Sequence, residues 1–106
     1  HLAQILANLL SNAVRYSPSG GRVRIRIDAR PDDVLVTVDN TSEPIGPTDL
    51  ARLFERFYRV EKSRDRERGG AGIGLAIVKQ LVERAGGHVG AESRDGVTRI
   101  WFTVPT

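Results

Sequence analysis

Three polar side chains near the start of the chain have the types and the spacing of a ligand-binding set. Asn8, Asn12 and Arg15 are three or four residues apart, and residues with that spacing are neighbours on the surface of a helix. Amide oxygens are suited to Mg²⁺, and a guanidinium is suited to phosphate. A solvated polar face would have the same pattern, and on this helix alone that alternative stays open.

A second candidate site is the cluster of glycines in residues 69–74, which leads directly into a helical pattern. Glycine lets the backbone approach a ligand closely, and the first turn of a helix offers unpaired N–H groups to a phosphate. The cluster is not a Walker P-loop, because it lacks Gly-Lys-Ser/Thr, nor a dinucleotide fingerprint, because no hydrophobic strand precedes it. Residues 61–68 carry seven charges in eight positions, and we expect them to form a mobile lid over bound phosphates.

Apolar periodicity predicts the elements that position these groups. Residues 1–15 are predicted to be a helix with a core-facing stripe, and strict alternation predicts an antiparallel hairpin over residues 22–27 and 34–38. The expected core positions in this half are Leu2, Ile5, Leu6, Leu9, Ala13, Val23, Ile25, Ile27 and Val36. The later elements are a short helix over residues 48–57, a helix over residues 73–85 that a Gly86-Gly87 cap closes, and a second hairpin over residues 88–92 and 98–104.

The order of these elements predicts a single α/β domain over residues 1–106. Hairpins separated by helices favour a two-layer sandwich in which a mixed, mostly antiparallel sheet packs against about three helices. Trp101 is expected in its core, and Phe54 and Phe57 are expected to pack beneath the lid.

The composition excludes several classes of function. There is no cysteine and there are only two histidines, so the sequence offers no disulfide and no zinc site. No apolar run approaches the ~18–20 residues of a membrane span. The net charge is +3, but the arginines are scattered among 13 acids without interleaved aromatics, so we expect no nucleic-acid partner.

Four motifs then occur in order along the chain, in residues 8–16, 38–40, 53–59 and 70–78. Together they resemble the catalytic ATP-binding domain of sensor histidine kinases, which are Bergerat-fold ATPases, and the resemblance covers essentially the whole chain. The run from Asp39 to Ile45, which ends in Glu-Pro-Ile, is similar to the adenine loop of heavy-metal-sensing kinases.

The resemblance implies a role for each matching residue, and ATP and Mg²⁺ as cofactors. Asn12, with Asn8 beside it, would coordinate Mg²⁺, and Asp39 would accept a hydrogen bond from the adenine amino group. The other residues that the resemblance places around the nucleotide are Arg15, Tyr16, Ile45, Tyr58, Arg59, Gly70, Gly72, Gly74 and Leu75. None of these is assigned a catalytic role.

Two positions depart from the pattern of related ATPases. Many members read Asp-x-Gly-x-Gly-Ile, whereas residues 39–45 lack both glycines and have one residue more. Chaperone, topoisomerase and mismatch-repair ATPases have a glutamate at the position of Asn8, where it activates the attacking water. An amide accepts no proton at neutral pH, so we expect slow hydrolysis and transfer to a protein side chain instead.

The resemblance also implies the partners. Neither His1 nor His88 has the context of a phosphoacceptor, so the phosphoacceptor histidine and the dimerisation helices are expected before residue 1 of a longer protein. The expected partners are that domain and a downstream response regulator, in the cytoplasm and without direct membrane contact. The alternatives are a Bergerat-type serine kinase or anti-sigma switch, and a degenerate, nucleotide-free interaction module.

Overall fold

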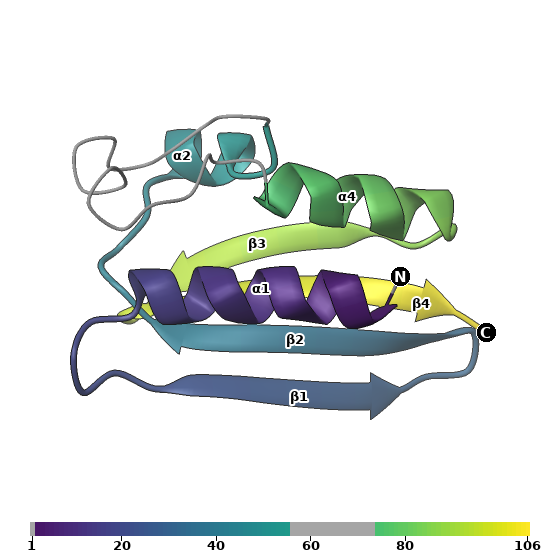
Figure 1. Cartoon of the computed structure of the whole chain (residues 1–106), viewed down its shortest axis with the longest axis horizontal. Coiled ribbons are helices and arrows are strands. Elements are labelled where there is room, and N and C mark those ends of the chain that lie inside the picture. The colour runs from purple at the N-terminus through teal and green to yellow at the C-terminus, as the bar shows by residue number, and fades with distance from the viewer. Residues whose placement is uncertain (1, 56–73) are drawn as a thin grey trace.

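The computed structural model describes residues 2–55 and 74–106, which form two layers (Figure 1). One layer holds helices α1 (Leu2–Tyr16) and α4 (Gly74–Arg84), side by side. The other is a four-stranded sheet of order β1-β2-β4-β3, and every pair is antiparallel. Its strands are β1 (Val23–Ala29), β2 (Asp33–Thr41), β3 (Val89–Arg94) and β4 (Val97–Pro105). The predicted α/β sandwich and both predicted hairpins are confirmed.

A third, shorter helix, α2 (Pro47–Arg52), lies beside β3. It begins with proline at its first position, where the missing N–H costs nothing. The helix predicted over residues 48–57 therefore starts one residue earlier, and α2 ends at Arg52. Phe54 packs against the core as expected, while Phe57 and the predicted lid lie outside the described residues.

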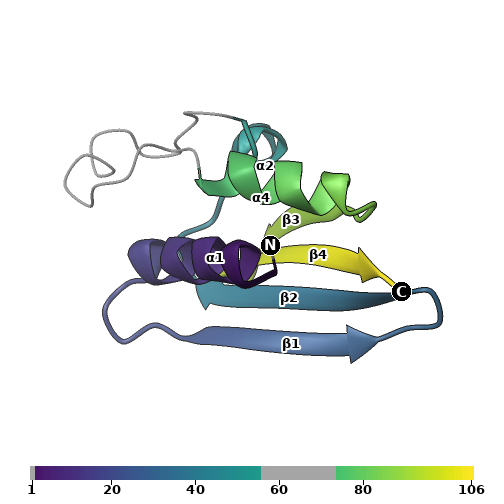
Figure 2. The ribbon, with the colours of Figure 1, turned by 45° about the vertical axis from the view of Figure 1, so that its right-hand side comes forward.

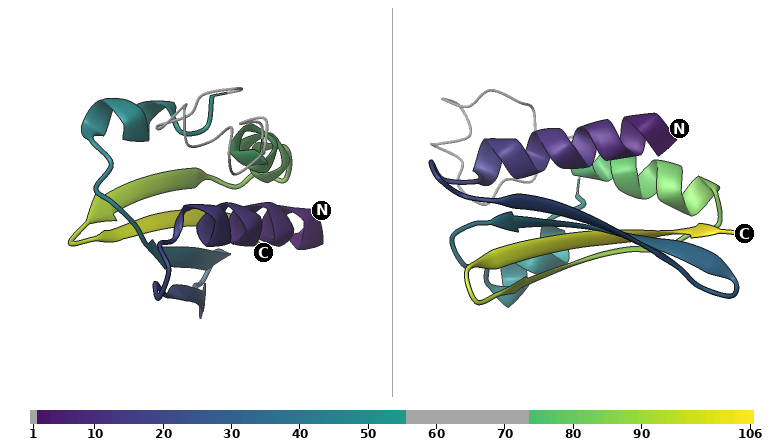
Figure 3. Two further views of the ribbon diagram at one scale, coloured as in Figure 1. Left: turned by 60° about the vertical axis from the view of Figure 1, so that its left-hand side comes forward. Right: turned by 90° about the horizontal axis from the view of Figure 1, so that it is seen from below.

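Helices α1 and α4 lie on the same side of the sheet (Figures 2 and 3), and the core residues lie between them and the two central strands. Phe102 of β4 is its largest fully buried side chain. The buried apolar residues are Ile5, Leu9, Ala13, Val36, Val38, Val78, Val82, Ile100 and Phe102. The helical stripe predicted from the sequence thus centres on Ile5, Leu9 and Ala13.

Several predicted core positions are wrong. Leu2 is 50% exposed, and Val23, Ile25 and Ile27 of β1 are 38%, 42% and 67% exposed. The β1 residues do point to the helix side, because they pair with Asn40, Val38 and Val36 of β2. However, β1 is the edge strand and α1 packs on β2. The alternation in the sequence predicted which face of the sheet these residues occupy, but not that α1 leaves them uncovered.

The prediction that Trp101 lies in the core is also wrong. It pairs with Thr37 and Gly90, and so it lies on the face of the sheet opposite the helices. A Cβ at Gly90 would lie 2.4 Å from the indole ring, which shows that the ring covers this glycine. Trp101 is therefore half-buried on the outer face, away from the main core.

The end of α4 is fixed by a Schellman cap. Gly86 has φ +85°, and its N–H donates to Glu83 O at 3.0 Å. The N–H of Gly87 reaches back to Val82 O, also at 3.0 Å. The chain then enters β3 so closely beside β4 that a Cβ on Gly87 would lie 2.1 Å from the backbone oxygen of Thr103.

This contact makes Gly87 a test of the packing between α4 and the sheet. We expect Gly87→Ala to lower the free energy of unfolding by about 1–3 kcal/mol. The added Cβ would clash with a backbone atom, which cannot rotate out of the way as a side chain could. Gly46→Ala is the matched control: its backbone is extended (φ −71°, ψ 164°) and no atom lies within 4 Å of the added Cβ. Urea unfolding followed by Trp101 fluorescence measures both, and equal stability of the two variants would contradict this packing.

Candidate functional site

The polar residues of α1 lie beside its buried stripe, as predicted. Asn8, Asn12 and Arg15 are each half-buried, whereas Gln4 and Ser11 of the same helix are exposed. The side of α1 away from the sheet is exposed, as the 68% exposure of Val14 shows, and α4 packs along α1 in the same layer. The two asparagines are one turn apart, and their amide oxygens can reach a common ligand.

Helix α4 lies beside α1 in the helix layer. It runs antiparallel to α1, so its N-terminal end lies beside the C-terminal half of α1 (Figure 1). Gly74 is the first residue of α4, and Leu75 packs partly buried against the core. Free backbone N–H groups of a first helical turn favour an anion at this position.

The end of β2 places Asp39 and Asn40 on opposite faces of the sheet. Val36 and Val38 are buried under α1, and successive strand residues alternate, so Asn40 shares their face. Asp39 points the other way, together with its cross-strand partners Arg24 and Arg99. The sequence analysis gave Asp39 the contact with the adenine amino group, whereas the structure places its side chain on the face of the sheet opposite Asn40 and the helices.

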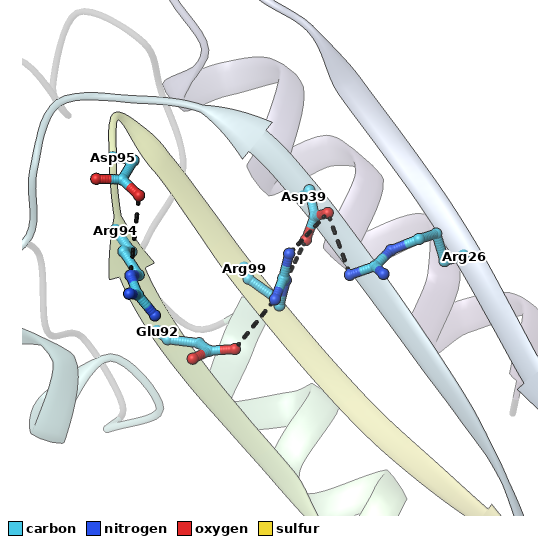
Figure 4. A network of polar contacts seen from close by, with 6 residues as sticks. All are labelled: Arg26, Asp39, Glu92, Arg94, Asp95 and Arg99. Carbon is cyan, nitrogen blue, oxygen red and sulfur yellow. Dashed lines mark hydrogen bonds and ion pairs between the residues drawn. The ribbon is translucent and has the colours of Figure 1, made fainter.

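The carboxylate of Asp39 is held in an ion-pair network on the outer face (Figure 4). Arg99 Nε donates to Asp39 Oδ1 at 2.8 Å, and Arg26 Nη2 lies 3.5 Å from Asp39 Oδ2. Arg99 Nη1 also contacts Glu92 Oε1 at 3.4 Å. The hydrogen bond to Asp39 and its charge raise the pKa of Arg99 above its usual value. This network ties β1, β2, β4 and β3 together and leaves Asp39 no role on the helix side.

Asn40 is the functional candidate that the sequence analysis missed. Its side chain is 3% exposed, and Nδ2 donates to Thr41 O at 3.1 Å. The carbonyl oxygen of Thr41 can only accept, so the Asn40 amide is oriented with Nδ2 toward it and Oδ1 away from it. In this orientation Oδ1 can accept a hydrogen bond from another group. Within the described residues Oδ1 has no hydrogen-bond partner. The alternation Val36, Val38, Asn40 carried the signal, but the predicted strand stopped at residue 38.

The loop after β2 is attached to the β3–β4 hairpin. Ile45 is half-buried, and its N–H donates to Ser93 Oγ at 2.9 Å. The N–H of Ser42 donates to Gly96 O at 3.0 Å. Residues 41–46 contain no positive φ, so the missing family glycines are not required by the backbone of this loop.

The remaining predicted site residues are described only in part. Tyr16 is the last residue of α1. Tyr58, Arg59, Gly70 and Gly72 lie outside the described residues.

Residues 2–55 and 74–106 contain no group of three or more His, Cys, Asp or Glu side chains arranged to hold a metal ion. Asn8 and Asn12 on α1 carry amide oxygens, which are hard ligands of the kind that Mg²⁺ takes. Of the helices in these ranges, none has the length and apolar character needed to cross a membrane.

Comparison with known proteins assigns the family. The family described as histidine kinase-, DNA gyrase B-, and HSP90-like ATPase matches residues 1–106. The chain is 44% identical over 107 residues to the sensor histidine kinase WalK of Bacillus subtilis and 47% identical over 104 residues to the sensor histidine kinase CusS of Escherichia coli K12. Each match covers 98% of this chain, but only 18% of WalK and 22% of CusS.

A solved structure agrees with these relatives. Full-length ShkA in complex with AMPPNP superposes with a TM-score of 0.82 at 36% identity, over 98% of this chain and 21% of that chain. The chain therefore belongs to the histidine kinase-, DNA gyrase B-, and HSP90-like ATPase family, and its relatives identify it as an ATP-binding domain of the sensor histidine kinase type. It spans about a fifth of the length of the curated relatives it matches.

The outer-face network predicts a salt-dependent contribution of Asp39 to stability. We expect Asp39→Asn to lower the free energy of unfolding by about 1 kcal/mol, a small value because Arg26 and Arg99 are 39% and 40% exposed and screened by solvent. The difference should shrink in 1 M NaCl. Asp32→Asn, at an exposed position of the β1–β2 turn, is the control. An Asp39→Asn effect that is independent of salt would contradict the ion-pair explanation.

Proposed function

We propose that the chain binds Mg-ATP and presents its γ-phosphate for transfer to a histidine on a separate domain of a sensor histidine kinase. The observation that carries the proposal is that three amide side chains, two half-buried and one buried, lie on the helix side of the sheet. Asn8 and Asn12 come from α1 and Asn40 from β2. Helix α1 and strand β2 run in the same direction (Figure 1), and Asn12 and Asn40 both belong to the C-terminal halves of these elements.

The phosphate end of the nucleotide is assigned to α1 and α4. The amide oxygens of Asn12 and Asn8 would hold Mg²⁺, which when bound neutralises charge on the phosphates. Arg15 lies on the same half-buried flank and would contact phosphate, and the first turn of α4 at Gly74 would offer backbone N–H groups. The resemblance adds Arg59, Gly70 and Gly72 to this end of the site.

The adenine end is assigned to Asn40 in place of Asp39. Counted from Asn40, the run to Ile45 has the length of the family pattern Asp-x-Gly-x-Gly-Ile, without an extra residue. Since Nδ2 is engaged by Thr41 O, Oδ1 is free to accept a hydrogen bond from the exocyclic amino group of adenine. Guanine presents a carbonyl oxygen there, which Oδ1 would repel. Tyr16, Ile45, Tyr58 and Leu75 would line this end.

The choice between ATP hydrolysis and phosphotransfer follows from the residue at position 8, which is an asparagine and not a base. Asn8 cannot remove a proton from an attacking water, so ATP would be held intact until an acceptor histidine enters. That histidine would be supplied by a phosphoacceptor and dimerisation domain of the same protein, and a response regulator would receive the phosphoryl group. We infer that the domain works in the cytoplasm, where ATP is available, without direct membrane contact.

The two alternatives are less well supported. A serine kinase or anti-sigma switch is not favoured, because relatives that are 44% and 47% identical are sensor histidine kinases. A nucleotide-free interaction module was suggested by the glycine-poor loop. That loop has no residue in a conformation that needs glycine, so its composition gives no support to a degenerate site.

The base assignment predicts a contrast between two adjacent residues. By calorimetry with Mg-ADP, we expect Asn40→Leu, which keeps the volume but removes the acceptor, to weaken binding about tenfold or more. Asp39→Asn is the matched control and should bind like the unaltered chain, since its side chain lies on the outer face.

The opposite result would be equally clear. Loss of binding in Asp39→Asn but not in Asn40→Leu would return the base contact to Asp39. Absence of any Mg-ADP binding to the unaltered chain would favour the interaction module.

The metal assignment predicts loss of phosphotransfer. Given an isolated phosphoacceptor and dimerisation domain and labelled ATP, the unaltered chain should label the histidine in trans while hydrolysing ATP slowly on its own. Asn12→Ala should reduce labelling at least tenfold and remove most of the Mg²⁺ dependence of ATP affinity. Gln4→Ala, an exposed amide on the same helix, is the control. Rapid ATP hydrolysis by the unaltered chain would contradict the role given to Asn8.

A further inference from the structure

The tip of the β3–β4 hairpin, residues 93–98, touches the loop that carries Ile45. Asp95 and Gly96 both have positive φ, 52° and 77°, which makes the tip a two-residue turn that matches the twist of its strands. Gly96 O accepts the N–H of Ser42 at 3.0 Å, so the loop is attached to the turn through backbone atoms. Two side-chain tethers add to this attachment.

The first tether joins Ser93 to the end of the loop. Ser93 Oγ accepts the N–H of Ile45 at 2.9 Å, across 48 residues of sequence. The Ser93 hydroxyl thus satisfies the backbone N–H of Ile45 from outside the loop. The bond therefore fixes where the Ile45 backbone, and with it the apolar side chain, lies relative to β3.

The second tether joins Thr98 to the start of the loop, and its direction can be deduced. Ser42 Oγ contacts both Glu43 O, at 3.0 Å, and Thr98 Oγ1. A hydroxyl has one proton, and the carbonyl can only accept, so Ser42 donates to Glu43 O. Thr98 must then be the donor to Ser42 Oγ. Thr98 is 4% exposed, so this contact is shielded from water.

Both tethers lie in the same row of the sheet as Asn40. Asn40 pairs with Thr98 across β2 and β4, and Thr98 pairs with Ser93 across β4 and β3. Since opposite residues of paired strands share a face, the three side chains form a polar row on the helix side. The loop thus leaves β2 just after Asn40 and is attached to the next two members of the row.

We propose that Ser93 and Thr98 are positioning residues for nucleotide binding, which hold Ile45 beside the base subsite at Asn40. This inference rests on the proposed function. A loop with Pro44 and without glycine between residues 41 and 45 keeps its position through bonds to the hairpin. Loss of either tether should therefore weaken the binding of an adenine nucleotide, although the change lies on a different element from Asn40.

The experiment compares removal and conservative replacement of each hydroxyl. Ser93→Ala and Thr98→Val should each raise the Kd for Mg-ADP about fivefold, the value of one hydrogen bond. Ser93→Thr and Thr98→Ser keep the hydroxyl and should stay within about twofold. Asp95→Asn is the control at the tip, because the Asp95 side chain is 91% exposed. Competition by magnesium tripolyphosphate, which has no base, should be unchanged in all variants.

Two measurements separate this inference from the proposed function. In the ligand-free protein, amide hydrogen exchange at Ile45 should be faster in Ser93→Ala than in the unaltered chain, whether or not nucleotide binds. If the unaltered chain binds Mg-ADP and Ser93→Ala and Thr98→Val bind equally well, the positioning role is wrong and the proposed function stands. If tripolyphosphate binding weakens as much as ADP binding, the hydroxyls support the whole domain rather than the base subsite, which also overturns the inference.

Discussion

The structure depends above all on strand β2, which is paired along its length on both sides. Residues 33–41 face β4, and all but the first and last of them also face β1. Burial of Val36 and Val38 under α1 fixes which face of β2 meets the helices. A slip of one residue would move every side chain to the other face, so burial of the valines also fixes Asn40 inside and Asp39 outside. The chemistry of the site is thereby set by the packing of its apolar neighbours.

The same principle orients the helices at the proposed phosphate end of the site. Burial of Ile5, Leu9 and Ala13 sets the rotation of α1 about its axis, and this rotation places Asn8 and Asn12 half-buried beside the apolar stripe. At the far end of α4, the Schellman cap and the close approach of Gly87 to Thr103 hold the helix on the sheet. Both helices of the site are therefore positioned by contacts outside it.

The sequence predicted the elements well because their periodicities are strong. Both hairpins and the two long helices follow from apolar spacing, and Gly86 was recognisable as a cap. The errors have physical causes. Alternation in β1 identifies the face of Val23, Ile25 and Ile27, but only the tertiary structure shows that α1 leaves the sheet edge uncovered. For Asp39, nothing local in the sequence showed that β2 continues to Thr41 or that the Asp39 side chain lies on the outer face of the sheet.

The separation of charge and amide across β2 also has an energetic reason. A buried carboxylate without a cation would be costly, whereas an amide is neutral and loses less when it leaves water. The charged member of the pair lies where Arg26 and Arg99 can reach it, and the neutral one is 3% exposed on the helix side. There Asn40 satisfies its donor with Thr41 O and keeps one acceptor oriented. Since a neighbouring backbone carbonyl fixes the amide before any ligand arrives, the base subsite would pay little to order this side chain on binding. The Ser93 and Thr98 tethers extend the same preorganisation to the loop. Where the family pattern has flexible glycines, this loop is held in place by hydrogen bonds to the hairpin.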